Sequence, residues 1–205
     1  MPRVFSFTPY ITEFKQSSLA EDHDLHIGKE GAYSSLSLYE KKDVTSKSFS
    51  NVIAKQRQKV DFLSVHPESN VLASRCVGDR RVDAVGINIK SNPRLFGRRF
   101  FKRCEREGTI LEIDITPLLS QIEAKELRKF YRCTRDIIHT GVPVLLTQKI
   151  QKITEARKYR DLQTIAEIHG IARKNTSIEC IIERLSVNKA KREGQILSDN
   201  VEVIL

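Results

Sequence analysis

Five cationic side chains lie within one short stretch of the sequence and could bind an anion. They are Arg98, Arg99, Lys102, Arg103 and Arg106. In a helix, which advances about 100° per residue, these cations share one side, and three phenylalanines and Cys104 share the other. Cations crowded on one face repel one another unless an anion binds, so we interpret this face as a phosphate-binding surface. A solvated helix face is the alternative. Further cations in predicted loops could extend the surface: Arg80, Arg81 and Arg94.

A second basic cluster follows a predicted strand at 142–147. Its members are Lys149, Lys152, Arg157, Lys158 and Arg160. Loops that leave the C-terminal ends of strands are where α/β folds place their binding sites. We therefore expect Lys149, Arg157, Lys158 and Arg160 to contact phosphate groups as well, and an ordinary polar loop is the alternative.

Two carboxylates, Glu112 and Asp114, alternate with aliphatic residues in a predicted strand. If helices cover the outside of a barrel, the aliphatic face points outward and the carboxylates point inward. Two inward acids could bind a metal or act as an acid/base pair, with His66 at a neighbouring strand end. The favoured alternative is a buried salt-bridge network with an inward Lys or Arg.

Other motifs give weaker indications of chemistry. His23 and His26 stand in a segment, 21–31, that we expect to be a loop, and no later histidine cluster completes a metal site. The chain has no P-loop, no G-x-G-x-x-G and no G-x-S-x-G motif. We therefore expect no covalent chemistry, no catalytic residue and no metal site in this chain.

The strands and helices that would position these residues include a short internal repeat, which we call the internal echo. Residues 59–65 (KVDFLSV) recur as 81–87 (RVDAVGI), 22 residues apart. Such apolar runs are typical of strands buried on both faces of a parallel sheet. Between them, Pro67 can open a helix with Val71, Leu72 and Cys76 inward.

The alternation of strands and helices continues along the chain. We predict strands at 4–11, 33–40, 109–115 and 142–147, and helices at 50–58, 92–107, 121–139, 160–169 and 175–185. In helix 121–139, Leu127, Phe130, Ile137 and Ile138 should point inward. This pattern predicts an α/β fold with a parallel sheet, either an incomplete (β/α) barrel or an open doubly wound sheet. No linker interrupts it, so we expect one domain at 1–197 and a C-terminal tail at 198–205.

Composition bounds the partner and the compartment. The 205 residues carry a formal net charge of +9, which suits a polyanion. The chain has no Trp and no aromatic strand motif for stacking bases, so structured RNA fits better than single strands. The four cysteines, spread over separate predicted helices, are expected to be buried reduced thiols in a reducing cytosol. No apolar run suggests a signal peptide or a membrane span.

Several ordered segments between about Val44 and Leu197 resemble ribonuclease P protein component 3, the barrel-like protein subunit of archaeal and eukaryotic ribonuclease P. The matching segments are 60–67 (VDFLSVHP), 81–83 (RVD), 92–96 (NPRLF), 111–119 (LEIDITPLL), 142–147 (VPVLLT) and 157–162 (RKYRDL), followed by His169-Gly170. The order and spacing of these segments carry the resemblance, because no single segment is diagnostic. The sequence departs from the family pattern at 148–150 (QKI), where the family has small residues, and near its N-terminus.

The resemblance implies an incomplete TIM-like (β/α) barrel related to the polymerase-and-histidinol-phosphatase barrel. It also implies a subunit of the ribonucleoprotein that removes 5′ leaders from precursor tRNA. In that enzyme the RNA subunit, with Mg²⁺, performs the cleavage, and the protein supports the RNA. The implied partners are ribonuclease P RNA, precursor tRNA indirectly, and other protein subunits, including a small ferredoxin-like one. The implied location is the cytoplasm, or the nucleus and nucleolus if the source is eukaryotic.

Two other functions stay open on sequence grounds. One is a metal-dependent phosphoesterase of the polymerase-and-histidinol-phosphatase type, whose barrel is related and whose ligands are His and Asp at successive strand ends. Only His66, of five histidines, stands at a clear strand end. The other is a different scaffold for structured RNA.

Overall fold

The computed structural model describes residues 4–5, 20–27, 32–39, 46–88, 91–119, 123–148, 157, 159–194, 196–198 and 201–202. Seven strands form one sheet in the order in which they occur along the chain. They are β1 (Val4–Phe5), β2 (Ala20–Ile27), β3 (Ala32–Tyr39), β4 (Phe62–His66), β5 (Ala84–Ile87), β6 (Ile110–Asp114) and β7 (Val144–Thr147).

The sheet is antiparallel at its beginning and parallel afterwards. β2 pairs antiparallel with both β1 and β3, whereas each neighbouring pair from β3 to β7 is parallel. A doubly wound sheet reverses its strand order at a switch point. The described strands show no such reversal, so the doubly wound alternative is wrong, and the order is consistent with a partial barrel.

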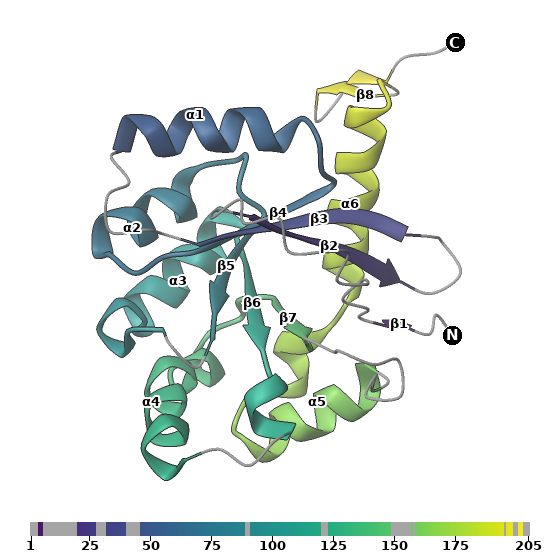
Figure 1. Ribbon diagram of the computed structural model, residues 1–205. Coiled ribbons are helices and arrows are strands. Elements are labelled where there is room, and N and C mark those ends of the chain that lie inside the picture. The colour runs from purple at the N-terminus through teal and green to yellow at the C-terminus, as the bar shows by residue number, and fades with distance from the viewer. Residues whose placement is uncertain are drawn as a thin grey trace.

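Helices follow the strands and cover the sheet. They are α1 (Ser46–Arg57), α2 (Asn70–Gly78), α3 (Arg98–Glu107), α4 (Ala124–Thr134), α5 (Tyr159–Ile168) and α6 (Glu179–Arg192), with short 3₁₀ turns η2 (Pro93–Leu95), η3 (Thr116–Leu119), η4 (Ile137–His139) and η6 (Arg173–Thr176). Figure 1 shows α1, α2, α3 and α4 following one another down one side of the sheet, with α5 continuing the arc. No helix in the described ranges is long and apolar enough to cross a membrane.

The central strands are buried on both faces, as the continuous apolar runs predict. Every residue of β4, β5 and β6 is buried. Helix side chains such as Ile53, Phe101 and Phe130 complete the same core. Because both faces of these strands are covered, helices must pack on one side and inward side chains must fill the other.

The internal echo has a structural meaning at the start of β4 and β5. Its two aspartates, Asp61 and Asp83, are 1% and 0% exposed. Asp83 forms an ion pair with Arg57 and accepts hydrogen bonds from Leu63 N and Asn188 Nδ2, both at 2.9 Å. Buried carboxylates are stable only when such donors and cations replace water.

Helix α6 reaches these aspartates from the far end of the chain. Asn188 Nδ2 also donates to Asp61 O at 2.9 Å, and Arg192 Nε lies 2.9 Å from Asp61 Oδ1. Arg184 Nη2 donates to Gly108 O at 3.0 Å, just before β6. The helix therefore crosses beneath the N-terminal ends of three successive strands, and it continues to Arg192, beyond the predicted end at residue 185.

Two further differences concern the segment at 21–31 and the helix predicted at 92–107. Residues 20–27 form β2, so the described part of the 21–31 segment is a strand and not the expected loop; a strand rich in charged residues lacks the apolar signal we used. Helix 92–107 is interrupted, since Gly97 has extended dihedral angles (φ −154°, ψ 173°) between η2 and α3. Gly108 (φ +67°) ends α3 and Gly170 (φ +85°) follows α5, as predicted, because a positive φ favours glycine.

Burial also corrects some individual assignments. Val71 and Ile138, both predicted to point inward, are 64% and 43% exposed. Ser69 caps α2 by accepting from Leu72 N, so the helix begins after Pro67 and its inward face shifts to Leu72, Ala73 and Cys76. Three of the four cysteines are buried free thiols, but Cys180 is exposed. The last described residues form a small hairpin of β8 (Ile196–Ser198) and β9 (Val201–Glu202).

Candidate nucleic-acid interface

The cations of α3 are placed outward by an aromatic inner face. Phe96 and Phe100 pack edge to face with ring centroids 5.4 Å apart, and Phe100 and Phe101 do so at 5.7 Å. Phe101 and Cys104 are fully buried. This packing fixes the rotation of the helix and leaves four cations exposed, as predicted: Arg98, Arg99, Lys102 and Arg106.

These exposed cations differ in their partners. Arg98, Arg99 and Lys102 have no ion pair within the described residues, whereas Arg106 Nη2 lies 2.8 Å from Glu107 Oε1. An exposed pair of this kind contributes little and is easily exchanged for another anion. The carboxylate of Asp136 accepts a hydrogen bond from Arg98 N, 3.1 Å away, and so caps the start of the helix. The part of α3 with the most uncompensated charge is therefore its first turn and a half.

The fifth cation, Arg103, leaves this group. It is half-buried and its Nη2 approaches Gly78 at the C-terminal end of α2. The helical periodicity grouped Arg103 with the other four cations because it describes α3 alone and contains no information about the neighbouring helix α2. Arg103 instead lines a pocket between α1, α2 and α3.

Helix α4 extends the basic surface, and sequence reasoning missed it. It packs against η2, and α3 packs against η4, so the two helices are neighbours (Figure 1). Its exposed cations recur at helical spacing: Lys125, Arg128, Arg132 and, one residue past the helix, Arg135. Arg94 on η2 is exposed between the two helices. The 3–4–3 spacing of these cations is the signal that would have found them.

The two predicted arginines after α2 have different roles. Arg81 donates to both carboxylate oxygens of Asp79 and to Ser50 Oγ at 3.0 Å, and so ties this loop to α1. The hydrogen bonds with Asp79 raise the pKa of Arg81 and lower that of Asp79. Arg80 is exposed, with no ion pair in the described part of the chain.

The second basic cluster is described only in part. Lys149, Lys152 and Lys158 lie outside the described residues. Arg157 and Arg160 are both exposed, and Arg157 N donates to Gln148 Oε1 at 3.2 Å just beyond β7. These two arginines stand at the C-terminal edge of the sheet, as predicted.

The strand-end acids are inward and buried, but their partners differ from our expectation. Glu112 is 9% exposed; its Oε2 lies 4.0 Å from His66 Nε2, and its Oε1 accepts from Thr147 Oγ1 at 3.3 Å. Asp114 accepts from Thr116 N at 3.0 Å. No Lys or Arg of the described residues forms an ion pair with either acid, so the expected salt-bridge network is not found within this part of the chain.

His66 is seated over a glycine. A Cβ at Gly86 would overlap Cε1, Nδ1 and Nε2 of the His66 ring, so the neighbouring strand provides the space that this buried ring occupies. Asn88 Nδ2 lies 3.4 Å from His66 Nδ1. Among the described residues, no group of three or more His, Cys, Asp or Glu side chains could hold a metal ion. His23 and His26 stand in β2, outside any such group.

Comparison with known proteins gives a likeness of fold. No protein-family profile matches the chain, and no curated protein sequence matches it. Among solved structures, a similar chain comes from a cryo-EM structure of archaeal ribonuclease P with mature tRNA. The two chains are 16% identical with a TM-score of 0.65, over 84% of this chain and 76% of the other. At this identity the likeness shows a shared fold.

Proposed function

We propose that this chain is a protein subunit of ribonuclease P, of the component 3 family, and that it binds and supports the catalytic RNA. The observation that carries the proposal is a cationic helix face on which Arg98, Arg99 and Lys102 have no ion pair within the described residues, on a fold shared with a chain from an archaeal ribonuclease P structure. The ordered sequence segments that resemble the family support the same assignment. The partial barrel is then a shortened TIM-like barrel related to the polymerase-and-histidinol-phosphatase type.

In this role, cations position the RNA and perform no chemistry. Phosphate contacts from Lys and Arg give affinity and set the orientation of the RNA. We assign these contacts to Arg80, to Arg94 on η2, to four cations of α3, to two arginines beyond β7, and to two lysines outside the described residues: Arg98, Arg99, Lys102 and Arg106; Arg157 and Arg160; Lys149 and Lys158. Arg81 joins them only by leaving Asp79, so we rank it last. Removal of the 5′ leader from precursor tRNA belongs to the RNA subunit and its Mg²⁺.

The proposal extends to partners and location. The chain would assemble with other protein subunits, including a small ferredoxin-like one, and contact precursor tRNA indirectly. It would work in the cytoplasm, or in the nucleus and nucleolus of a eukaryote.

The test is the identity of the bound RNA. We expect tagged chain isolated from its source cells to retain one large structured RNA, identified by sequencing, in a salt-sensitive manner. The pure protein should not cleave RNA. Metal-dependent cleavage by the pure protein that Glu112→Ala abolishes would contradict the proposal and favour the phosphoesterase alternative.

A further inference from the structure

The outer face of α4 carries a row of exposed cations that the RNA contacts assigned above do not include: Lys125, Arg128, Arg132 and Arg135. Because they recur every three or four residues, they lie on one side of the helix, along about 15 Å of its length. Lys125, Arg128 and Arg132 form no ion pair within the described residues. Glu126, the one acid of α4, lies about 100° around the helix from Lys125. Like charges in such a row repel one another, and a bound polyanion removes that repulsion.

A shared aspartate joins this row to the cations of α3. Asp136, just past the end of α4, accepts a hydrogen bond from Arg98 N at 3.1 Å, and its Oδ1 lies 3.6 Å from Arg135 Nε. The last cation of the α4 row therefore stands beside the first cation of α3. Both helices bury their inner faces in one hydrophobic core, through Phe101 and Phe130, so their outer faces both point away from it. Figure 1 shows the two helices next to each other on the same side of the sheet.

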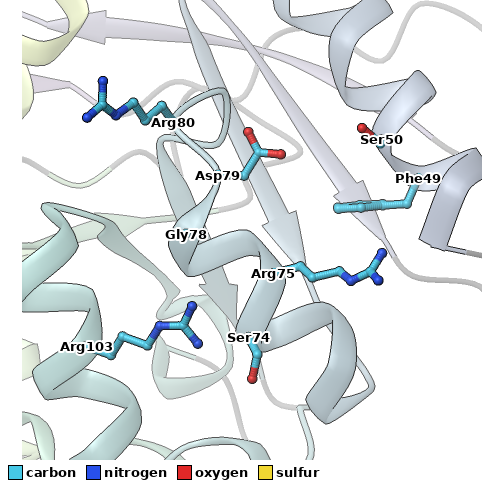
Figure 2. Close-up of a pocket in the computed structure, with 8 residues that line it drawn as sticks. All are labelled: Phe49, Ser50, Ser74, Arg75, Gly78, Asp79, Arg80 and Arg103. Atoms are coloured by element: carbon cyan, nitrogen blue, oxygen red, sulfur yellow. The ribbon is translucent and has the colours of Figure 1, made fainter.

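These cations form one basic surface, which we call the α3–α4 surface: the α4 row together with Arg98, Arg99 and Lys102. Figure 2 shows Arg103 reaching from α3 toward α2, while Arg75 and Arg80 point away from it, so the cations around α2 do not continue the surface. At the last turn of α3, Arg106 pairs with Glu107. The surface therefore runs from the start of α4 to the middle of α3.

This surface offers phosphate contacts and no platform for stacking bases. The four aromatic side chains of α3 and α4 are all buried or half-buried: Phe100, Phe101, Phe130 and Tyr131. Proteins that hold single strands stack the bases on aromatic rings. Double-helical RNA is bound instead through its shape and its phosphates, which follow one another at fixed spacing. Each cation of a rigid helical row can contact a phosphate of its own, so the side chains need not converge on one point.

We propose that the α3–α4 surface binds the backbone of a double-helical segment of RNA. The choice of RNA as the polyanion rests on the proposed function. The participation of α4 and the preference for a duplex rest on the placement of the cations and of the aromatic rings. A single strand of RNA and an acidic protein are the competing partners.

The test compares two charge-matched variants. Arg128→Gln with Arg132→Gln removes two exposed cations from the middle of the α4 row. Arg173→Gln with Lys174→Gln removes two exposed cations from η6, which packs against α5 and β7. Binding is measured over a range of salt concentrations with an RNA duplex of about 16 base pairs and with an unpaired strand of the same length. Circular dichroism and the unfolding midpoint serve as folding controls. If the α4 pair does not fold, Lys125→Gln with Arg128→Gln, from the start of the same row, takes its place.

We expect the α4 variant to lower the slope of log K against log salt for the duplex by about 1–2, because each lost phosphate contact lowers it by about 0.9. The η6 variant should leave the slope unchanged. Wild type should bind the duplex on the order of tenfold more tightly than the unpaired strand. Equal slopes in the two variants would remove α4 from the interface and overturn the proposal. Equal or tighter binding of the unpaired strand would overturn the choice of a duplex, and a wild type that binds neither RNA would overturn the proposal in favour of an acidic protein.

Failure of this inference can be told apart from failure of the proposed function. The proposed function fails if the tagged chain from its source cells does not retain ribonuclease P RNA, and duplex binding that depends on α4 can still hold in that case. Conversely, retention of that RNA together with equal slopes in the two variants leaves the proposed function standing, with α3 and without α4 as its contact.

Discussion

Replacing Gly86 by alanine should destabilise the protein through a single clash. The new Cβ would overlap three atoms of the His66 ring, which is rigid and only 5% exposed, so the ring must leave its site. Overpacking in a well-filled core costs about 1–3 kcal/mol, and we expect the upper half of this range because the ring cannot flex away. The displaced ring also loses its contacts with Asn88 and Glu112.

A double-mutant cycle isolates the clash. His66→Ala alone removes a buried ring and should cost about 1–3 kcal/mol, but it also empties the space that the Gly86→Ala methyl needs. The double variant should therefore lose about 2 kcal/mol less unfolding free energy than the sum of the two single losses, which corresponds to a urea midpoint roughly 1 M higher than additivity predicts.

The assay is urea unfolding followed by far-ultraviolet circular dichroism for wild type, both single variants and the double variant. Additive effects, with no coupling, would show that His66 does not occupy the space above Gly86 and would refute this account of the strand ends.

Three other expectations follow from described contacts. Asn188→Ala leaves two buried acceptors without their donor and should lower the free energy of unfolding in urea by about 2 kcal/mol. Ser186→Ala, at an exposed position of the same helix, should lower it by under about 0.5 kcal/mol. Equal costs would contradict the stabilising contact between α6 and the starts of β4 and β5. Arg98→Ala with Lys102→Ala should weaken RNA binding and lower the salt slope by about 1–2 without loss of fold, and an unchanged slope would remove these residues from the interface. Burial lowers the pKa of His169, so the unfolded chain binds the proton more readily. The contribution of His169 to stability should be complete above about pH 6.5 and fall below it, and His169→Gln should flatten that part of the curve of urea midpoint against pH.

Sequence patterns predicted the elements whose burial is simple. The apolar runs of β4, β5 and β6 are continuous, so their assignment as central strands needed no tertiary information. The inward direction of Glu112 and Asp114 also followed from alternation within a strand that is covered by helices. Their partners did not, because a histidine on one strand and a threonine on another meet Glu112 only through the register of the sheet.

In the candidate site, too, local periodicity was predicted correctly and contacts between elements were not. The periodicity of α3 predicted its exposed cations, but the departure of Arg103 depends on where α2 ends, which no helical wheel contains. The α4 cations were not predicted, because the apolar residues of this helix indicate only which face is buried and not which neighbouring helix continues its exposed face. Strand β2 was missed because its residues are mostly polar, and its pairing with β1 and β3 is visible only in the backbone.

The connection between α6 and the first parallel strands bears on the order in which the chain can fold during synthesis. The side-chain amide of Asn188 donates hydrogen bonds to Asp61 O and to Asp83 Oδ1, and Asn188 lies 127 and 105 residues further along the chain than these aspartates. A ribosome adds about 5–20 residues per second, so the starts of β4 and β5 wait several seconds or more for the helix that covers them. During that interval Arg57 is the nearby cation already synthesised, and two aspartates stay exposed to water. We therefore expect this end of the sheet to stay hydrated until α6 has emerged, and to close after the rest of the described parallel sheet.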